Sequence, residues 1–437
     1  MLPVTGMWQN WARTERSHPV LEVAPRTVDQ VVLAVQRALE TGHTVKAIGA
    51  SHSFTAIGAT DGVRVDLSRL RGLVGVDLDS GRVTLWAGTH LWELPAILNP
   101  LGLALENMGD IDQQTISGAT STGTHGTGLA FGGLASRVVA ATLVTGTGDV
   151  LTISETENAE LLPAVSLGLG ALGILVTLTI QCVPRYLLRA VEAPLPLAEV
   201  LDTYVERNRE ADHFEFYWFP HTTGTRTKTN TRLPLDDGAA PLGVVAKFVD
   251  EEVVNNVVLG ALVNMQAVFP RTSPRINRTI QSISSRREYS DESYRVFVTR
   301  RRVRFREMEY ALPLEAVPTA LRELKAMIDR RGFHVSFPIE VRAAAADTLM
   351  LSTAHERESG YIAVHRFQRD RDHAYFREAE AILSAHAGRP HWGKMHTRTA
   401  DQLRAVYPRF DDFLAVRDRL DPDRAFANPY LDRVLGD

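Results

Sequence analysis

The chain has 437 residues, of which 44% are hydrophobic and 23% are charged. A single core seldom grows beyond about 250 to 300 residues, so this length predicts more than one domain. The formal net charge is -4 with both signs interspersed, which excludes the basic footprint of a nucleic-acid-binding protein. Cys182 is the only cysteine, which excludes an internal disulfide and a cysteine-based metal cage and suits a reducing cytoplasm.

The N-terminal residues and one uncharged stretch bear on localisation. Residues 1–8 lack the charged start and the apolar core of a signal peptide, so we expect a cytoplasmic protein. Residues 253–270 carry no charge, but four amide side chains interrupt them, and the stretch is marginal for the roughly 20 apolar residues of a membrane span. We expect a packed amphipathic helix there, with membrane contact at most peripheral.

The one basic cluster is the run Arg300-Arg301-Arg302-Val303-Arg304-Phe305-Arg306. Its arginines alternate with apolar residues at Val303 and Phe305, a pattern typical of a strand with one solvated face. We therefore interpret the cluster as a surface strand and expect no nucleic-acid partner.

The first notable segment is a strand over residues 45–48 that leads into the small-residue turn Gly49-Ala50-Ser51-His52-Ser53-Phe54. A helix precedes it, with Thr27 as a plausible N-cap and Gly42 at its end. An alternating strand follows over residues 63–67. Glycine and alanine allow close backbone approach, and consecutive N–H groups in such a turn can bind a pyrophosphate. The alternative is a loop whose histidine simply faces solvent.

A second candidate segment is rich in glycine and threonine and spans residues 115–128. It follows a predicted strand at 83–88 and a helix that we expect to be capped by Thr89 and to run to Leu98. Backbone and hydroxyl groups of the segment can donate to phosphate oxygens, although it lacks a Walker lysine and Rossmann spacing. The alternative is an ordinary surface loop.

The remaining elements divide near Pro184. Before it we expect strands at 138–145 and 150–154, a helix near 159–167, and an apolar strand after Gly173. After it we expect strands at 214–219 and 225–231 and a helix from Pro318 to Gly332, without regular βαβ alternation. This pattern predicts an α+β second domain.

Three later stretches place charged residues in apolar strand contexts. Glu340 and Arg342 are two residues apart and so share one face of a strand. His365 ends a strand, and His391-Trp392-Gly393-Lys394-Met395-His396 contains two histidines and a lysine. The alternatives are a surface ion pair and an ordinary core histidine. His391 and His396 lack the i, i+4 spacing of a metalloprotease, so we expect no metal.

The turn at 49–54 followed by Thr60-Asp61-Gly62 resembles the first flavin segment of the vanillyl-alcohol oxidase type of FAD enzymes, in the sugar-lactone and alditol branch. The resemblance runs from Trp8 to Leu431 and is thinnest between about 233 and 290. It implies an α+β fold with a two-part FAD-binding domain (1–184), a central α+β substrate or cap domain (185–390) and a C-terminal segment (391–437) that returns to the FAD domain.

The resemblance also implies cofactor contacts. The loop at 115–128 resembles the family's second flavin segment, and Gly173 and Ile174 lie where the family approaches the adenine half of FAD. His52 is expected to bond covalently to the flavin methyl group. The implied cofactor-binding residues are Ile48, Gly49, Ala50, Ser51, His52, Ser53, Phe54, Gly109, Asp110, Thr115, Gly118, Ser121, Thr122, Gly123, Thr124, His125, Gly173, Ile174 and His391.

The His-Trp-Gly-Lys run resembles the C-terminal signature of this branch, and the Glu-x-Arg pair resembles its substrate pair. They imply oxidation of an aldono-1,4-lactone, such as L-gulono- or D-arabinono-1,4-lactone, by hydride transfer to flavin N5. Arg342 and Lys394 are expected to stabilise the developing negative charge, and Glu340 to bind hydroxyls. His365 is the expected proton acceptor.

Two positions bear on substrate and electron acceptor. Phe367 stands where alditol oxidases tend to carry a hydroxyl residue, which favours a lactone at C2, giving an ascorbate-type product, over a polyol. Gly109 leaves oxygen access open by resemblance, which favours oxygen over a cytochrome or quinone acceptor. The alternatives are an alditol oxidase and, more remotely, a non-catalytic carbohydrate- or nucleotide-binding protein.

Overall fold

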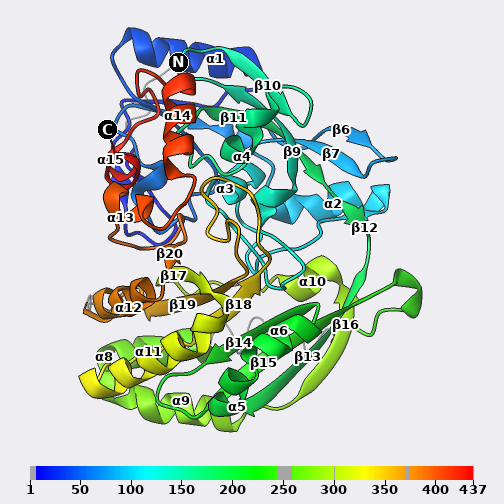
Figure 1. Ribbon diagram of the computed structural model, residues 1–437, viewed down its shortest axis with the longest axis vertical. Helices are drawn as coiled ribbons and strands as arrows, with labels where there is room; N and C mark the ends of the chain where they lie inside the picture. Colours follow the sequence, from blue (N-terminus) through cyan, green and yellow to red (C-terminus); the bar gives the residue numbers. More distant parts are fainter. Residues whose placement is uncertain (1–5, 244–257, 300, 371–373, 437) are drawn as a thin grey trace.

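The computed structural model describes residues 6–243, 258–299, 301–370 and 374–436. Three of the sequence predictions fall partly outside the described residues. The parts outside are residues 1–5 of the N-terminus expected to lack a signal peptide, residues 253–257 of the expected helix, and Arg300 of the basic run. Two bodies are stacked along the long axis, and both chain ends lie in the upper one (Figure 1). The predicted α+β architecture is confirmed.

The upper body contains two main sheets. One is parallel, with strand order β3-β5-β4, and the other is antiparallel, with order β10-β9-β11-β7-β6. Their hydrophobic sides share one core with the short helices between them. The elements are β3 (Leu21–Val23), α1 (Val28–Glu40), β4 (Val45–Ile48), β5 (Val63–Asp66), β6 (Leu73–Asp77), β7 (Arg82–Trp86), α2 (Leu94–Leu98), α3 (Ile116–Ser121), β9 (Val138–Val144), β10 (Val150–Ser154), α4 (Leu162–Val165) and β11 (Ile174–Gln181).

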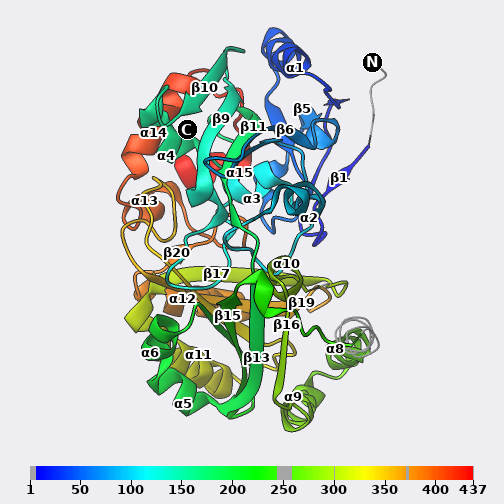
Figure 2. The same ribbon diagram turned by 90° about the vertical axis from the view of Figure 1, so that its right-hand side faces the viewer.

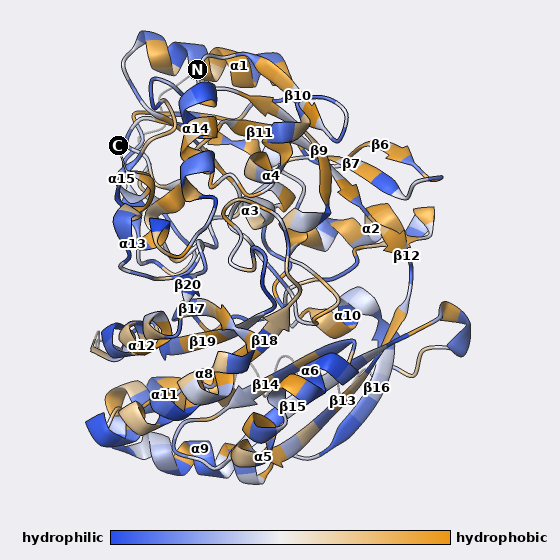
Figure 3. Cartoon of the chain, in the orientation of Figure 1, coloured by the Kyte–Doolittle hydropathy of each residue, from blue (hydrophilic) through white to orange (hydrophobic). Residues whose placement is uncertain are grey.

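Helix α1 forms as its sequence predicts. The hydroxyl of Thr27 accepts the backbone N–H of Gln30, and Gly42 follows the helix with φ +67°. Orange and blue faces alternate along the helix, and the apolar side packs on the sheet (Figure 3). The cap predicted at Thr89 is wrong, because His90 forms the capping box with Glu93, while the Thr89 hydroxyl donates to the Trp86 carbonyl.

The C-terminal segment returns to the upper body. Its helices pack in the same core as the N-terminal sheets (Figure 1). Backbone N–H of Val45 donates to Ala425, and the buried ammonium of Lys46 donates to the carbonyls of Gly170 and Phe426, each at 2.9 Å. The strand before the flavin-like turn is therefore fastened to the chain end. The helices are α13 (Ala400–Arg404), α14 (Phe410–Leu420) and α15 (Pro429–Leu435).

The lower body is built on one eight-stranded antiparallel sheet with order β16-β13-β15-β14-β18-β19-β17-β20. Four helices cover its outer face, as the two views agree (Figures 1 and 2). The elements are β13 (Leu187–Pro196), α5 (Leu197–Asp202), α6 (Tyr204–Glu210), β14 (His213–Trp218), β15 (Gly224–Leu233), β16 (Arg287–Glu292), α10 (Ser293–Phe297), β17 (Phe305–Pro313), α11 (Val317–Arg331), β18 (Ile339–Ala344), β19 (Ser359–Phe367), α12 (Ala374–Ala385) and β20 (Arg389–Pro390).

Alternation along β14, β18, β19 and β17 places most apolar side chains on one face and most charged side chains on the other, although Arg306 and Arg366 lie over aromatic rings on the helix side. Side chains such as Phe216 and Val341 point toward the helices and join their core. Because successive strand residues face opposite sides, their neighbours point toward the upper body. That second face carries Glu215, Tyr217, Glu307, Glu309, Glu340, Arg342 and His365.

The basic run at 300–306 does not form the predicted surface strand. Strand β17 begins at Phe305, and both Phe305 and Arg306 are buried. Arg301 reaches inward to the carboxylate of Asp110 at 2.5 Å. The prediction was wrong because the acidic partners of these arginines lie far away in sequence.

A pair of helices, α8 (Leu259–Val268) and α9 (Ser273–Ser282), stands at the edge of the lower body beyond β16 (Figure 2). Within the described chain, none of the helices combines the length and the apolar character needed to cross a bilayer.

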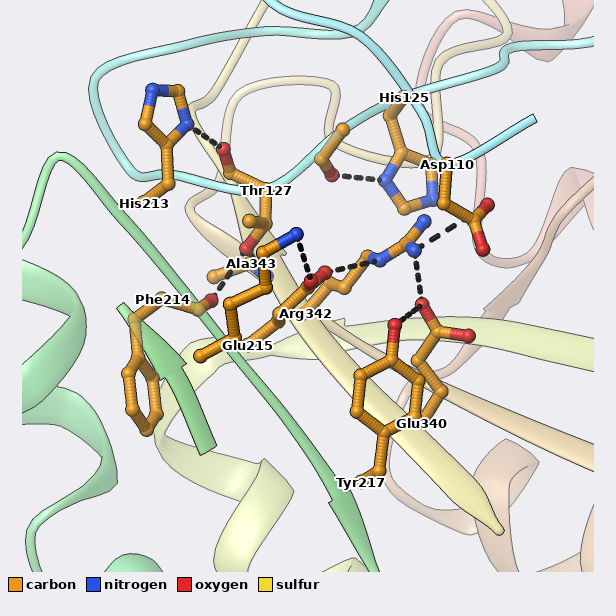
Figure 4. Close-up of polar contacts among 12 residues, drawn as sticks. Asp110, His125, Thr127, His213, Phe214, Glu215, Tyr217, Glu340, Arg342 and Ala343 are labelled. Carbon is orange, nitrogen blue, oxygen red and sulfur yellow. Dashed lines mark hydrogen bonds and ion pairs between the residues drawn. The ribbon is translucent and has the colours of Figure 1, made fainter. Parts of the chain in front are cut away.

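Thr127 and His213 join the two bodies (Figure 4). The Thr127 hydroxyl donates to the Phe214 carbonyl at 2.6 Å and accepts the Ala343 N–H at 3.2 Å. Nδ1 of His213 donates to the Thr127 carbonyl at 2.7 Å. The loop that contains the second flavin-like segment is therefore fixed directly to strands β14 and β18. Domain boundaries at 184 and 390 stay a prediction, which limited proteolysis would check.

We predict a pH-dependent loss of stability from His213. Nδ1 donates to Thr127, and Nε2 lies 3.3 Å from the donor Nε of Arg232, so the neutral ring uses both nitrogens. Burial, aided by the positive Arg232, lowers the pKa of His213 to about 4. The unfolded value is about 6.5. Between these values the unfolded chain binds more protons, so this contribution to stability is lost as pH falls.

The test is urea unfolding of the wild type and a His213→Gln variant between about pH 4.5 and 7. The slope of the unfolding free energy against pH should be smaller in the variant than in the wild type, by up to about 1.4 kcal/mol per pH unit. His18→Gln, at an exposed histidine, is the control. An unchanged slope in His213→Gln would contradict the assignment.

Candidate active site

The first cavity of the site lies in the upper body, where the two flavin-like segments meet. Strand β4 delivers the turn Gly49–Phe54 to one wall, α3 and its preceding loop form a second wall, and the turn at 169–173 closes a third. Packing between the first two walls is tight, since a Cβ on Gly49 would lie 2.2 Å from Oγ1 of Thr115. Only glycine fits at position 49.

The turn offers unused backbone donors to this cavity. Among the described residues, no acceptor is recorded for the N–H groups of residues 49–53, and Ser51 adopts a left-handed φ of +57°. Consecutive N–H groups bent in this way form a concave anion-binding nest. These residues are half-buried beside the cavity, where a ligand with phosphate oxygens can accept their N–H groups. These residues therefore fit the pyrophosphate of FAD.

His52 stands where the first cavity meets a second one. Its ring stacks on Trp11 with centroids 5.5 Å apart. Burial, together with the positive charge of Lys394, lowers the pKa of His52 to about 4. The imidazole is therefore neutral at physiological pH and retains the lone pair that a bond to carbon requires.

The second cavity, which we call the inner pocket, lies between the upper body and the charged face of the lower sheet. His52, Ser53, Gln114 and Thr122 line both cavities, so the two adjoin. Its other walls come from distant parts of the chain. They include Trp11, Phe54, Gly109, Asp110, Thr124, His125, Arg301, Glu307, Glu309, Glu340, Arg342, His391 and Lys394.

Arg342 is the centre of the buried charge network (Figure 4). Its guanidinium donates to Glu215 at 3.0 Å, pairs closely with Glu340, and lies 3.4 Å from Asp110. Burial alone lowers the pKa of Arg342, but the surrounding carboxylates outweigh burial and raise it well above its usual value. Arg342 is thus a permanent cation, and the predicted face-sharing of Glu340 and Arg342 is confirmed.

Two carboxyl groups beside Arg342 are shifted in opposite directions. Burial raises the pKa of Glu340, and Asp110 and Glu215 add to this against the pull of Arg342. Burial also acts on Asp110, but Arg301 and Arg342 outweigh it and hold its pKa well below its usual range. Glu340, which also accepts a hydrogen bond from Tyr217 at 3.3 Å, is the carboxyl group nearer to a proton-accepting state.

A second ion cluster is centred on Glu307. Its carboxylate pairs closely with the ammonium of Lys394 and lies 3.4 Å from Nε2 of His365. Burial opposes the charged forms, yet Lys394 and His365 lower the pKa of Glu307, while Glu307 and Glu309 raise that of Lys394. Nδ1 of His365 donates to the Pro338 carbonyl at 3.0 Å, which leaves Nε2 facing Glu307.

His125, Glu309 and His391 are buried, and their ligand atoms all lie within 4.8 Å of one another. Such donors can bind zinc. However, Nδ1 of His391 accepts the Gly393 N–H at 3.0 Å, so the neutral ring carries its proton on Nε2 and offers no lone pair. Nδ1 of His125 donates to Gly126, and Nε2 lies 3.5 Å from Glu309. The arrangement suits a hydrogen-bonded chain, and the absence of a metal stays a prediction.

Most of the predicted site residues line one of these two cavities. Gly123 and Ile174 line neither, since Gly123 turns the chain with φ +77° and Ile174 is buried in the core. His365 lines an outer chamber below the inner pocket, and Phe367 packs in an apolar cluster with Phe305 and Phe337. Phe367 therefore does not line the inner pocket, and its position gives no support to the substrate preference inferred from it.

Sequence reasoning missed five residues of the network. Glu307 and Glu309 are separated by one residue in an apolar strand, the same signal that revealed Glu340 and Arg342. Arg301 was hidden in the basic run. Glu215 and Tyr217 lie in the aromatic stretch of β14, where alternation faces them away from the helices.

Comparison with solved structures supports the fold, and a family profile supports the cofactor. A cholesterol oxidase from Brevibacterium sterolicum aligns with a TM-score of 0.81, 17% identity, and coverage of 98% of this chain and 96% of that one. At this identity the likeness concerns the fold alone. A family profile described as an FAD binding domain matches residues 19–154, which contain both flavin-like segments. The fold and site define an FAD-dependent oxidoreductase.

The family follows from sequence comparison. A profile described as D-arabinono-1,4-lactone oxidase matches residues 178–434. An L-gulono-1,4-lactone dehydrogenase of Mycobacterium tuberculosis is 41% identical, covering 99% of this chain and 100% of the relative. An L-gulonolactone oxidase of Bos taurus is 33% identical, covering 98% of each. The chain belongs to the D-arabinono-1,4-lactone oxidase family, which confirms the predicted sugar-lactone branch.

We predict that Lys394 acts directly on the reaction. A Lys394→Met variant removes the cation beside His52 and should slow flavin reduction by about 10² to 10³. The measurement is anaerobic stopped-flow absorbance of purified, FAD-containing protein. Lys325→Met on α11, an exposed lysine paired with Asp329, is the control. Equal reduction rates in Lys394→Met and the wild type would contradict this prediction and indicate a structural role for Lys394.

Proposed function

We propose that the protein oxidises the C2 hydroxyl of an aldono-1,4-lactone, such as L-gulono- or D-arabinono-1,4-lactone, to give an ascorbate-type product. Bound FAD supplies the hydride acceptor. The names of the relatives support the substrate class, and the charged sheet face beneath the flavin-like segments supports the chemistry. The observation that carries the proposal is the meeting of Arg342, Glu340 and Lys394 in one pocket with His52.

Each residue has a role in this proposal. Arg342 and Lys394 are fixed cations that stabilise negative charge developing on the alcohol oxygen. Glu340 binds a substrate hydroxyl and holds the Arg342 fork in place. The hydroxyl proton passes toward His365, whose Nε2 lies 3.4 Å from the Glu307 carboxylate. His365 lines the outer chamber, so the proton leaves in the direction away from the cofactor.

The substrate class is tested with a panel of aldono-1,4-lactones and open alditols, each assayed with an artificial electron acceptor. The pocket holds fixed cations at Arg342 and Lys394. We expect lactones to reduce the flavin at rates well above those for alditols. Reduction by alditols alone would favour the polyol alternative. A protein that binds FAD and is reduced by neither would contradict the proposal.

We also propose that His52 is bonded covalently to the flavin methyl group. Its low pKa, its position between the cavities and the resemblance of the turn support this. The denatured protein should keep flavin fluorescence on a gel, and His52→Ala should lose it. His18→Ala is the matched control at an exposed histidine. Complete release of flavin from denatured wild type would contradict the bond.

The electron acceptor and localisation are also proposals. Gly109 borders the inner pocket. A Cβ at this position would lie 3.1 Å from the His125 carbonyl oxygen, which is a tight contact, whereas glycine leaves this space open. Such a wall supports oxygen as one acceptor. A cytoplasmic location agrees with the lone, buried Cys182.

A further inference from the structure

The inner pocket adjoins an outer chamber of about 580 Å³ on the lower body. Asp110, Arg301, Phe305 and Glu340 line both spaces and mark the junction. Cavities of roughly 300 to 1,000 Å³ enclose drug-sized ligands. A sugar lactone is smaller than such ligands, so the chamber has space for a larger reactant.

The walls of the chamber are mostly apolar. Helices α8 and α9 contribute aliphatic side chains on one side, and phenylalanines close the other. A sugar lactone carries polar groups on nearly every carbon and gains little from such walls. The aliphatic lining residues are Val258, Leu259, Leu262, Ile276, Ile280 and Ile283.

Part of the entrance is apolar. Val258 and Ile283 line the chamber while being 43% and 73% exposed, and they share its rim with the exposed Arg275 and Thr279. Helices α8 and α9 stand at the edge of the body (Figure 2). An apolar rim favours a ligand that partitions out of water.

The charged groups of the far wall are already paired. Glu192 accepts hydrogen bonds from Arg226 at 2.9 Å and from Arg287 at 2.8 Å. Burial opposes its ionisation, but these arginines lower the pKa of Glu192 to about 2. One carboxylate thus faces two arginines, so this cluster carries a net positive charge. Glu192 is already paired, so it calls for no cationic ligand.

Hydrogen-bond donors lie at the inner end of the chamber. Arg301 pairs with Asp110 at 2.5 Å and points at the junction, where its side chain stays 26% exposed. Phe305 and Phe337 flank this end with aromatic surface. A flat ring with a carbonyl oxygen matches this combination of a cationic donor and aromatic walls.

From these observations we propose that the outer chamber binds a lipid-soluble quinone as electron acceptor, with its ring at Arg301 and its apolar tail along α8 and α9. The inference rests on the proposed FAD-dependent function. The quinone gains two electrons and two protons, and both of its carbonyls become hydroxyls. The electrons and one proton come from the reduced flavin, which returns to its oxidised form, and the second proton comes from water.

Decylubiquinone is the probe, and Leu262→Asp is the test variant because it places a carboxylate on the chamber wall. The holoenzyme is reduced anaerobically with dithionite, so the reoxidation rate does not depend on lactone oxidation. Decylubiquinone should reoxidise the wild type with saturation, and Leu262→Asp should lower the apparent second-order rate at least about tenfold. Leu262→Met should keep the wild-type rate, as should the control Leu33→Asp on the exposed side of α1.

Calorimetric binding of decylubiquinone to the oxidised holoenzyme gives a second readout that needs no turnover. The affinity should fall at least about tenfold in Leu262→Asp and stay constant in Leu262→Met. Flavin reduction by lactone should be equal in all variants. Absent binding, or equal binding in wild type and Leu262→Asp, overturns the proposal. A matching loss of lactone reduction in Leu262→Asp also overturns it and assigns the chamber to the organic substrate.

Discussion

The structure depends on neutralising the charged face of the lower sheet. Alternation along β14, β17, β18 and β19 directs the carboxylates to the side opposite the helices, where the upper body covers them. Buried charges are tolerated when they are paired and hydrogen-bonded. Arg342, Arg301 and Lys394 supply the pairing. Removing one cation would leave an unpaired buried carboxylate, so the network couples the stability of the interface to the residues proposed for catalysis.

The same constraint explains why the chain end returns across the whole molecule. His391 and Met395 donate backbone hydrogen bonds to the carbonyls of Glu309 and Glu307 in β17, and Phe54 donates to Gly393 at 2.7 Å. The Trp-Gly-Lys run is thus held between the edge of the sheet and the His52 turn. Lys394 reaches Glu307 only from this position. A short backbone junction therefore joins the cofactor turn, the charged sheet and the C-terminal segment.

The two bodies divide the chemistry between them. The upper body offers free N–H groups in a glycine-dependent turn, which suit an anionic cofactor. The lower body offers fixed cations and carboxyl groups on a rigid sheet, which suit a polyhydroxylated substrate. The outer chamber is lined by charged residues such as Asp110 and Arg301 where it meets the inner pocket, and by aliphatic residues along α8 and α9. Three neighbouring spaces thus differ in polarity, and each matches a different participant in a flavin-dependent oxidation.

The sequence by itself determined the family, the α+β class, the two flavin-like segments and the Glu340–Arg342 pair, because these depend on local patterns of turn residues and strand alternation. It did not determine the partners of those residues. The stretch at 300–306 was expected to be a surface strand, but its Arg301 pairs with Asp110 beside the inner pocket. Phe367 packs in an apolar cluster. Charge pairing and cavity shape depend on strand order and on contacts between segments hundreds of residues apart, so only the tertiary structure decided them.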